Sequence, residues 1–105
     1  MTTMARNDTQ AVREILSPAA RWGQLAEECM ELGQVALKMQ RHCMEENPPR
    51  DLLFQIQEKF LEELADVMNA LSVVDLQPHR DQVMQVRKQK MARWAAHLAR
   101  LEEAE

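Results

Sequence analysis

Apolar residues recur along most of the chain at the three- and four-residue spacing of amphipathic helices, and polar stretches separate the runs. A short first helix is expected from about Asp8 to Leu16. Ser17 and Pro18 then predict a helix start, with Ser17 as the N-cap and Pro18 at the first helical position. The pattern predicts a long second helix from about Pro18 to about Met44.

The acidic, proline-rich stretch EENPPRD follows, and no helix can continue through it. A third helix is expected from about Asp51 to Asp75, with Asp51 as its cap. Leu76-Gln77-Pro78 breaks that helix, and a fourth is expected from about Pro78 to near the C-terminus. Because a short connection favours antiparallel neighbours, we expect two long central antiparallel helices in a bundle of about four.

Glutamates lie beside the predicted core stripe of the second helix. At about 100° per residue, Glu28 and Glu31 fall at the edge of that stripe, and Glu27 lies further round the helix. The stripe itself is centred on Leu25 and comprises Trp22, Leu25, Cys29, Leu32, Ala36 and Met39.

The third helix repeats this arrangement. Glu63 and Asp66 lie along one edge of an apolar cluster centred on Leu64, which comprises Leu53, Phe60, Leu64, Val67, Met68 and Leu71. If the two helices pack antiparallel, their edges can meet. Four carboxylates would then face one cleft, and they are Glu28, Glu31, Glu63 and Asp66.

Composition points to the same all-α fold class. Strong helix formers dominate the 105 residues, which we interpret as a single domain spanning residues 1–105. The net charge of −4 argues against a nucleic-acid polymer as partner, because phosphate neutralisation supplies most of such affinity. No apolar run approaches the roughly 20 residues of a membrane span, and the polar start lacks a signal-peptide core. We expect a cytoplasmic protein with no membrane partner.

The cysteines fit a reducing compartment. Cys29 and Cys43 lie on one predicted helix, about 21 Å apart along its axis, which is too far for a disulfide. We expect two reduced, mostly buried thiols. Gly33 on the same helix is interpreted as a small residue that permits close helix approach.

Four converging carboxylates repel one another, and a divalent cation removes that cost. Mg²⁺ prefers oxygen ligands and usually keeps waters or binds substrate phosphates. Spacing i, i+3 places two ligands one turn apart on one face, so each helix can contribute a pair. The pattern is typical of phosphoryl chemistry, in which the ion neutralises phosphate oxygens and lowers the pKa of a bound water.

The residues EECME at 27–31 and ELAD at 63–66 resemble the EExxE…ExxD signature of the MazG-like, all-α NTP pyrophosphohydrolases. The likeness covers roughly Trp22 to Leu71. It implies Mg²⁺-dependent hydrolysis of an NTP or dNTP to the monophosphate and pyrophosphate, with Mn²⁺ a possible substitute. The metal ligands then map to Glu28, Glu31, Glu63 and Asp66. Glu27 would sit behind the ligands or belong to the base machinery.

The resemblance also implies substrate-binding residues. Lys59 precedes ExxD by four residues, and Lys90 and Arg93 on the fourth helix are candidates for phosphate binding or for a solvated helix face. Asn69 could contact sugar or phosphate, or bond a neighbouring helix. Trp22 could stack on the base, although a packing role suits its place on the apolar stripe better.

Two other function classes were weighed. A ferritin-like redox bundle uses Glu-x-x-His motifs, and no such motif occurs in the chain. A non-catalytic helical interaction protein remains the alternative, because the periodicity alone is compatible with it. In either case the third helix carries apolar residues over more than one stripe, so we expect a homodimer or homotetramer that completes the helical core.

Overall fold

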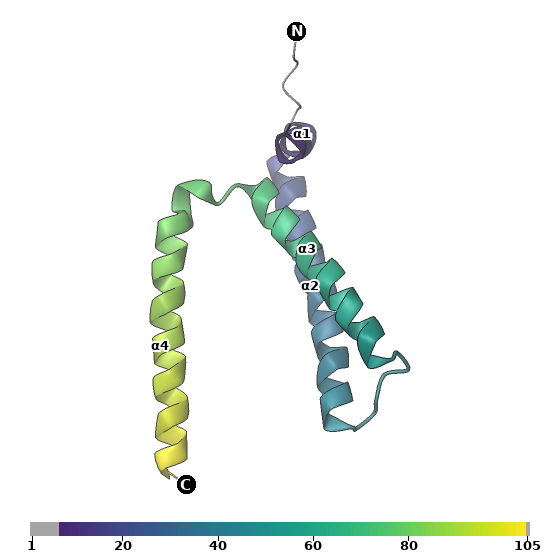
Figure 1. Cartoon of the computed structure of the whole chain (residues 1–105). Helices are drawn as coiled ribbons and strands as arrows, with labels where there is room; N and C mark the ends of the chain where they lie inside the picture. Colours follow the sequence, from purple (N-terminus) through teal and green to yellow (C-terminus); the bar gives the residue numbers. More distant parts are fainter. Residues whose placement is uncertain (1–6, 105) are drawn as a thin grey trace. The chain divides into compact units, whose positions relative to one another are not determined.

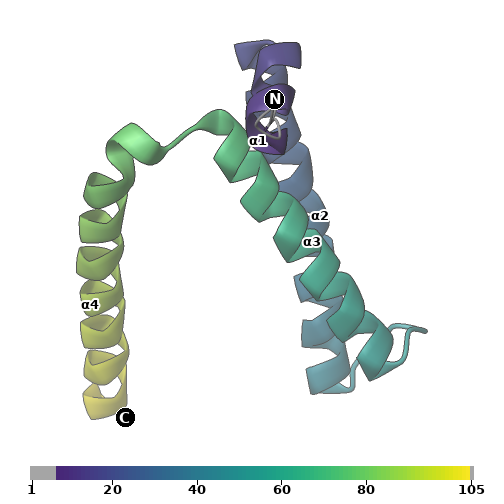
Figure 2. The same ribbon diagram turned by 45° about the horizontal axis from the view of Figure 1, so that its top comes forward.

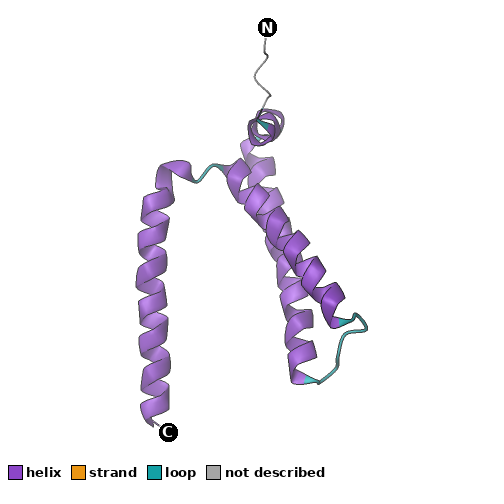
Figure 3. Ribbon diagram, viewed as in Figure 1, coloured by secondary structure: helices purple, strands orange, loops and turns teal. Residues whose placement is uncertain are grey.

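The computed structural model describes residues 7–104, and it confirms the all-α fold class. Figures 1 and 3 show a chain of helices joined by short loops, with no strand among the described residues. The elements are α1 (Asp8–Ile15), α2 (Pro18–Met44), α3 (Leu53–Val74), a 3₁₀ turn η1 (Gln77–His79) and α4 (Arg80–Ala104). The chain divides after Asp75 into two compact units.

The first two helices begin where local side-chain caps satisfy backbone donors. The Asn7 carboxamide oxygen accepts from the Thr9 N–H at 2.9 Å at the start of α1. Ser17 Oγ accepts from the Ala20 N–H at 3.2 Å, and Pro18 occupies the first turn of α2. Helix α2 ends at Glu45, which adopts the left-handed conformation with φ 58°. These boundaries lie within a residue of the predicted ones.

The start of α3 corrects one prediction, because Asp51 is not its cap. The N-cap is Leu52, whose N–H donates to Gln55 Oε1 at 2.9 Å. Asp51 instead accepts from Lys38 Nζ at 2.8 Å. This contact ties the loop that follows α2 back to the body of α2.

Helices α2 and α3 run antiparallel and side by side, as predicted, in both Figure 1 and Figure 2. Few side chains are fully buried in this pair. Those in α2 and α3 are Val35, Ile56, Glu63, Val67 and Ala70. A charged residue thus lies within the small core that the two helices share.

The predicted core stripes were rotated from the buried ones. On α3 the stripe was centred on Leu64, whereas the buried face is centred about 90° away, nearer to Glu63. The reason is that Phe60, Leu61 and Met68 remain exposed, so the apolar direction of the helix averages a buried face and an uncovered one. On α2, likewise, Glu28 turns toward the shared interface while Cys29 is exposed.

Other side chains predicted to be buried are also exposed within this unit. Cys29 and Cys43 are free, exposed thiols, and Trp22 is 58% exposed. Nothing lies within 4 Å of a Cβ added at Gly33. The close helix approach proposed at this glycine is therefore not made among the described residues. Cys29, Gly33 and Trp22 share one uncovered side of α2.

Arginine side chains fasten α1 to its neighbours. Arg13 donates through Nε to the carbonyls of Ser72 at 3.1 Å and Val73 at 3.3 Å, at the C-terminal end of α3. Its guanidinium also lies 3.6 Å from Asp75. Arg21 donates to the carbonyl of Leu16 at 3.1 Å. Since α1 has no buried residue, these polar contacts at helix ends carry much of its attachment.

Replacing Arg13 by Ala should loosen α1 without melting α2 and α3. The change removes charge-assisted hydrogen bonds to α3 carbonyls, each worth about 1.5–3 kcal/mol. Backbone amides of Asp8–Ile15 should then exchange with deuterium faster, while those in the middle of α3 stay protected. Arg50→Ala, an exposed loop change of equal charge, is the control. Unchanged exchange in α1 would show that apolar contacts hold it.

The second unit consists of η1 and α4. Helix α4 contains no buried residue, as befits a single helix described by itself. Among residues 7–104, no helix combines the length and apolar character needed to cross a membrane.

Candidate metal centre

Four carboxylates from α2 and α3 converge at the middle of the helix pair. Each of them offers an oxygen that lies within 4.8 Å of the oxygens of the other three. They are the residues predicted from the sequence, Glu28, Glu31, Glu63 and Asp66. The i, i+3 spacing brings each pair onto one face, and the antiparallel packing brings the two faces together.

The four carboxylates differ in exposure. Glu63 is buried, with 5% of its surface accessible, and Glu28 is half-buried. Glu31 and Asp66 are exposed. The cluster therefore has a buried side within the helix interface and a side open to solvent, and a small ion or a phosphate could approach from the open side.

Neighbouring polar side chains orient the two less exposed carboxylates. Gln24 Nε2 donates to Glu28 Oε1 at 2.6 Å, one turn earlier on α2. Lys59 Nζ lies 3.0 Å from Glu63 Oε1 on α3, and 3.6 Å from the exposed Glu62. Each carboxylate is thus held through one oxygen, which leaves its other oxygen directed elsewhere.

The remaining oxygens have no partner. Both Glu28 Oε2 and Glu63 Oε2 are inaccessible to solvent and make no hydrogen bond. A buried acceptor without a partner costs free energy, and two carboxylates at this separation repel each other. The donor set is all oxygen, which suits Mg²⁺ or Mn²⁺. The residues present therefore fit a hard divalent cation.

Mutual repulsion also changes the acidity of the cluster. A protonated Glu31 can donate to the Glu63 carboxylate, and the negative charges of Glu28 and Glu63 disfavour its ionised form, so the pKa of Glu31 is raised. The Lys59 ammonium responds in the opposite sense. Its hydrogen bond to Glu63 and the nearby negative charges raise its pKa and keep it cationic.

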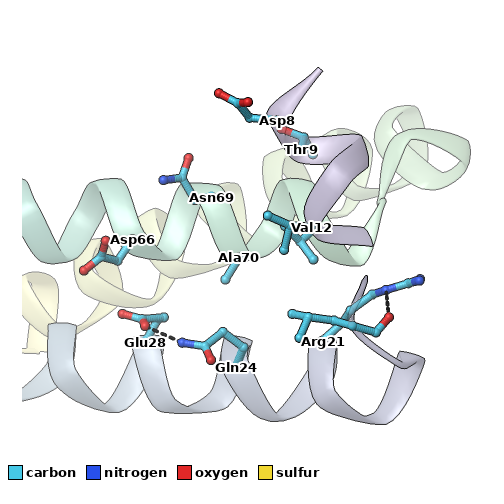
Figure 4. A pocket seen from close by; sticks show the side chains of 11 residues that line it. Asp8, Thr9, Val12, Arg21, Gln24, Glu28, Asp66, Asn69 and Ala70 are labelled. Atoms are coloured by element: carbon cyan, nitrogen blue, oxygen red, sulfur yellow. Dashed lines mark hydrogen bonds between the residues drawn. The ribbon is translucent and has the colours of Figure 1, made fainter. Parts of the chain in front are cut away.

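A cavity opens on one side of the cluster, toward the N-terminal end of α2. We call it the α1 cavity, because α1 forms one of its walls (Figure 4). Glu28 and Asp66 face each other across its inner end, and Asn69 lines it with its amide directed away from α2. Its volume of about 390 Å³ lies within the range of small-molecule sites. It is lined by Asp8, Thr9, Val12, Leu16, Arg21, Gln24, Glu28, Asp66, Asn69, Ala70 and Val73.

A second cavity lies on the other side of the cluster, toward the C-terminal end of α2. We call it the lysine cavity. Two of the clustered carboxylates line its inner end, and two ammonium groups line the rest. Its residues are Glu31, Gln34, Val35, Lys38, Lys59 and Glu63. The four-carboxylate cluster thus sits between two cavities that differ in charge.

The structure places the other predicted site residues unevenly. Lys59 contacts the cluster and Asn69 lines the α1 cavity. Glu27 is exposed and is not among the four converging carboxylates. Trp22 lies on α2 but does not line either cavity. Lys90 and Arg93 belong to α4, in the second unit, and their predicted phosphate contacts stay predictions.

Several residues of the site were not singled out from the sequence. Gln24 could have been found, because it precedes Glu28 by one helical turn. Lys38 could have been found in the same way, one turn beyond Gln34. The wall that α1 contributes, with Thr9 and Val12, carried no sequence signal, because it depends on where Arg13 fastens α1.

Fold and site together define an all-α protein with a four-carboxylate cluster suited to a divalent cation. Comparison of the chain with models of protein families, with curated proteins and with solved structures found no match.

Proposed function

We propose that the chain is a Mg²⁺-dependent nucleoside triphosphate pyrophosphohydrolase acting on cytoplasmic nucleotides. The observation that carries this proposal is the convergence of four carboxylates, two of which keep a buried oxygen without a partner. The resemblance of residues 27–31 and 63–66 to the EExxE…ExxD signature supplies the choice of reaction. The orphaned oxygens support a cation, and the cavities on either side support an elongated ligand.

In the proposed reaction a water attacks the α-phosphorus, and the bond from that phosphorus to the oxygen bridging to the β-phosphate breaks. The products are a nucleoside monophosphate and pyrophosphate, with one proton released. Glu28, Glu31, Glu63 and Asp66 would hold Mg²⁺, which when bound neutralises phosphate charge and lowers the pKa of a water.

The chain's own residues then have separate tasks. The Gln24 amide fixes the orientation of Glu28, and Lys59 fixes that of Glu63. Ligands held in this way need less reorganisation when the ion and the phosphates bind. Glu31 and Asp66 remain open to solvent, on the side from which a triphosphate can reach the cluster.

Incubation with each NTP and dNTP should release pyrophosphate from at least one of them. Mg²⁺ or Mn²⁺ should be required, and Ca²⁺ should serve poorly, because the site offers only oxygen ligands. The measurement is a coupled pyrophosphate assay, with a chelator-treated sample as control. Release of inorganic phosphate without pyrophosphate would indicate a different cleavage. Inactivity across the whole panel would favour the non-catalytic interaction protein.

We also propose that the chain assembles as a homodimer or homotetramer. Exposed apolar residues line one side of α3 away from α2, namely Leu53, Phe60, Leu61, Met68 and Leu71. A contiguous apolar face on a small protein usually marks an interface. The uncovered side of α2 that carries Gly33 and Cys29 is suited to close packing for the same reason.

A further inference from the structure

The two cavities beside the carboxylate cluster lie in a fixed order along the helix pair. The α1 cavity uses earlier residues of α2 and later residues of α3, such as Gln24 and Ala70. The lysine cavity uses later residues of α2 and earlier residues of α3, such as Lys38 and Lys59. A ligand bridging both cavities must therefore cross the cluster along the helix axes, with one end in each.

Charge distinguishes the two ends. Lys38 and Lys59 place two ammonium groups in the lysine cavity. The cation that lines the α1 cavity is Arg21, and its guanidinium donates to the backbone carbonyls of Arg13 and Leu16. Asp8 adds a negative charge at that end. Phosphates are therefore favoured at the lysine end and disfavoured at the other.

The lining of the α1 cavity suits an uncharged group instead. Val12, Leu16, Ala70 and Val73 supply apolar surface, while Thr9 and Asn69 supply neutral hydrogen-bonding groups. This mixture of apolar walls with a few polar groups is typical of sites that bind a planar or ring-shaped organic group.

Lys38 is available to a phosphate at little cost. Its contact with Asp51 is an ion pair between side chains that are 44% and 42% exposed. Pairs of this kind contribute little to stability, so an incoming phosphate can take the place of Asp51. Lys59, by contrast, is already engaged with Glu63 of the cluster.

We propose that Lys38 binds the phosphates beyond the scissile bond, so that the substrate lies across the cluster with pyrophosphate at the lysine cavity and nucleoside in the α1 cavity. This direction of binding rests on the proposed function, and it assigns Lys38 to the leaving pyrophosphate. Lysine serves here as a mobile point charge for phosphate oxygens.

Product binding tests the direction. Lys38→Ala should weaken binding of Mg²⁺-pyrophosphate about tenfold or more, because a charge-assisted contact is lost, and should leave binding of the nucleoside monophosphate unchanged. Val12→Ala should do the reverse, by about fourfold for a lost methylene contact. Asp51→Asn should tighten pyrophosphate binding by freeing Lys38. Arg50→Ala is the control for loss of one exposed positive charge.

Both dissociation constants are measured by calorimetry with Mg²⁺ present, and as inhibition constants in the pyrophosphate assay. Circular dichroism confirms that each variant folds. If the wild type hydrolyses nucleotides but Lys38→Ala weakens only the monophosphate, or weakens neither product, the proposed direction is wrong and the function stands. If the wild type hydrolyses nothing, calorimetry still decides whether pyrophosphate binds at Lys38, and absence of a Lys38 effect would overturn the assignment.

Discussion

Replacing Glu31 by Gln or Asp66 by Asn is expected to abolish pyrophosphate release while the protein remains helical. Each change removes one anionic ligand from the cluster of four. Loss of groups that merely support metal ligands costs about 10- to 100-fold in affinity or activity, so loss of a ligand should cost at least about a hundredfold. The measurements are the pyrophosphate assay and calorimetric titration with Mg²⁺, with Glu58→Gln as an exposed control on the same helix as Asp66.

The same substitution at Glu31 should stabilise the metal-free protein. Its pKa is raised because the neighbouring carboxylates disfavour its charge, so the folded protein binds this proton more readily than the unfolded chain does. Folding stability from this group is therefore present at low pH and is lost as pH rises through the raised pKa. The melting temperature of Glu31→Gln should exceed that of the wild type at pH 7 and match it in acid. A lower melting temperature at pH 7 would show that Glu31 supports the fold.

Light scattering without nucleotide should give a mass of at least twice the 12.2 kDa of one chain. Leu61→Glu should lower that mass, because it places a charge in the middle of the apolar side of α3, where Leu61 is 64% exposed. Arg50→Ala changes the net charge equally and should leave the mass unaltered. The predicted loss in assembly is large, since a buried charge without a partner opposes association strongly.

A monomer mass for the wild type that still hydrolyses nucleotides would contradict the proposed assembly. Reduced mass in both variants would point to a general effect of charge and not to the apolar side of α3. If Leu61→Glu lowers the mass and also removes activity, while circular dichroism stays unchanged, the site depends on the assembled form.

The ends of the helices could be predicted because local chemistry determines them. Ser17 and Pro18 mark the start of α2, and the two prolines after Asn47 exclude a helix between α2 and α3. The four clustered carboxylates were likewise predictable, since their i, i+3 spacing fixes each pair on one face. Asp51 misled the prediction because its side chain pairs with Lys38, a contact across the loop.

The depth of each residue could not be predicted in the same way. Periodicity gives the average apolar direction of a helix, and on α3 that average combines the side facing α2 with the side that carries Leu61 and Met68. Glu63 was therefore placed at an edge, whereas it is buried. The α1 cavity was unpredictable for a related reason, because Arg13 recognises backbone carbonyls, which every residue offers equally.

The uneven exposure of the cluster affects how such a protein would obtain its metal. A cation bound there would have solvent-facing ligands, Glu31 and Asp66, on one side and only Glu63 deeply buried on the other. Nothing in that arrangement encloses an ion, so exchange with the surroundings would be rapid and a chelator would strip it readily. Catalytic output would then follow the free magnesium level of the cell from moment to moment, and not the history of metal loading during folding.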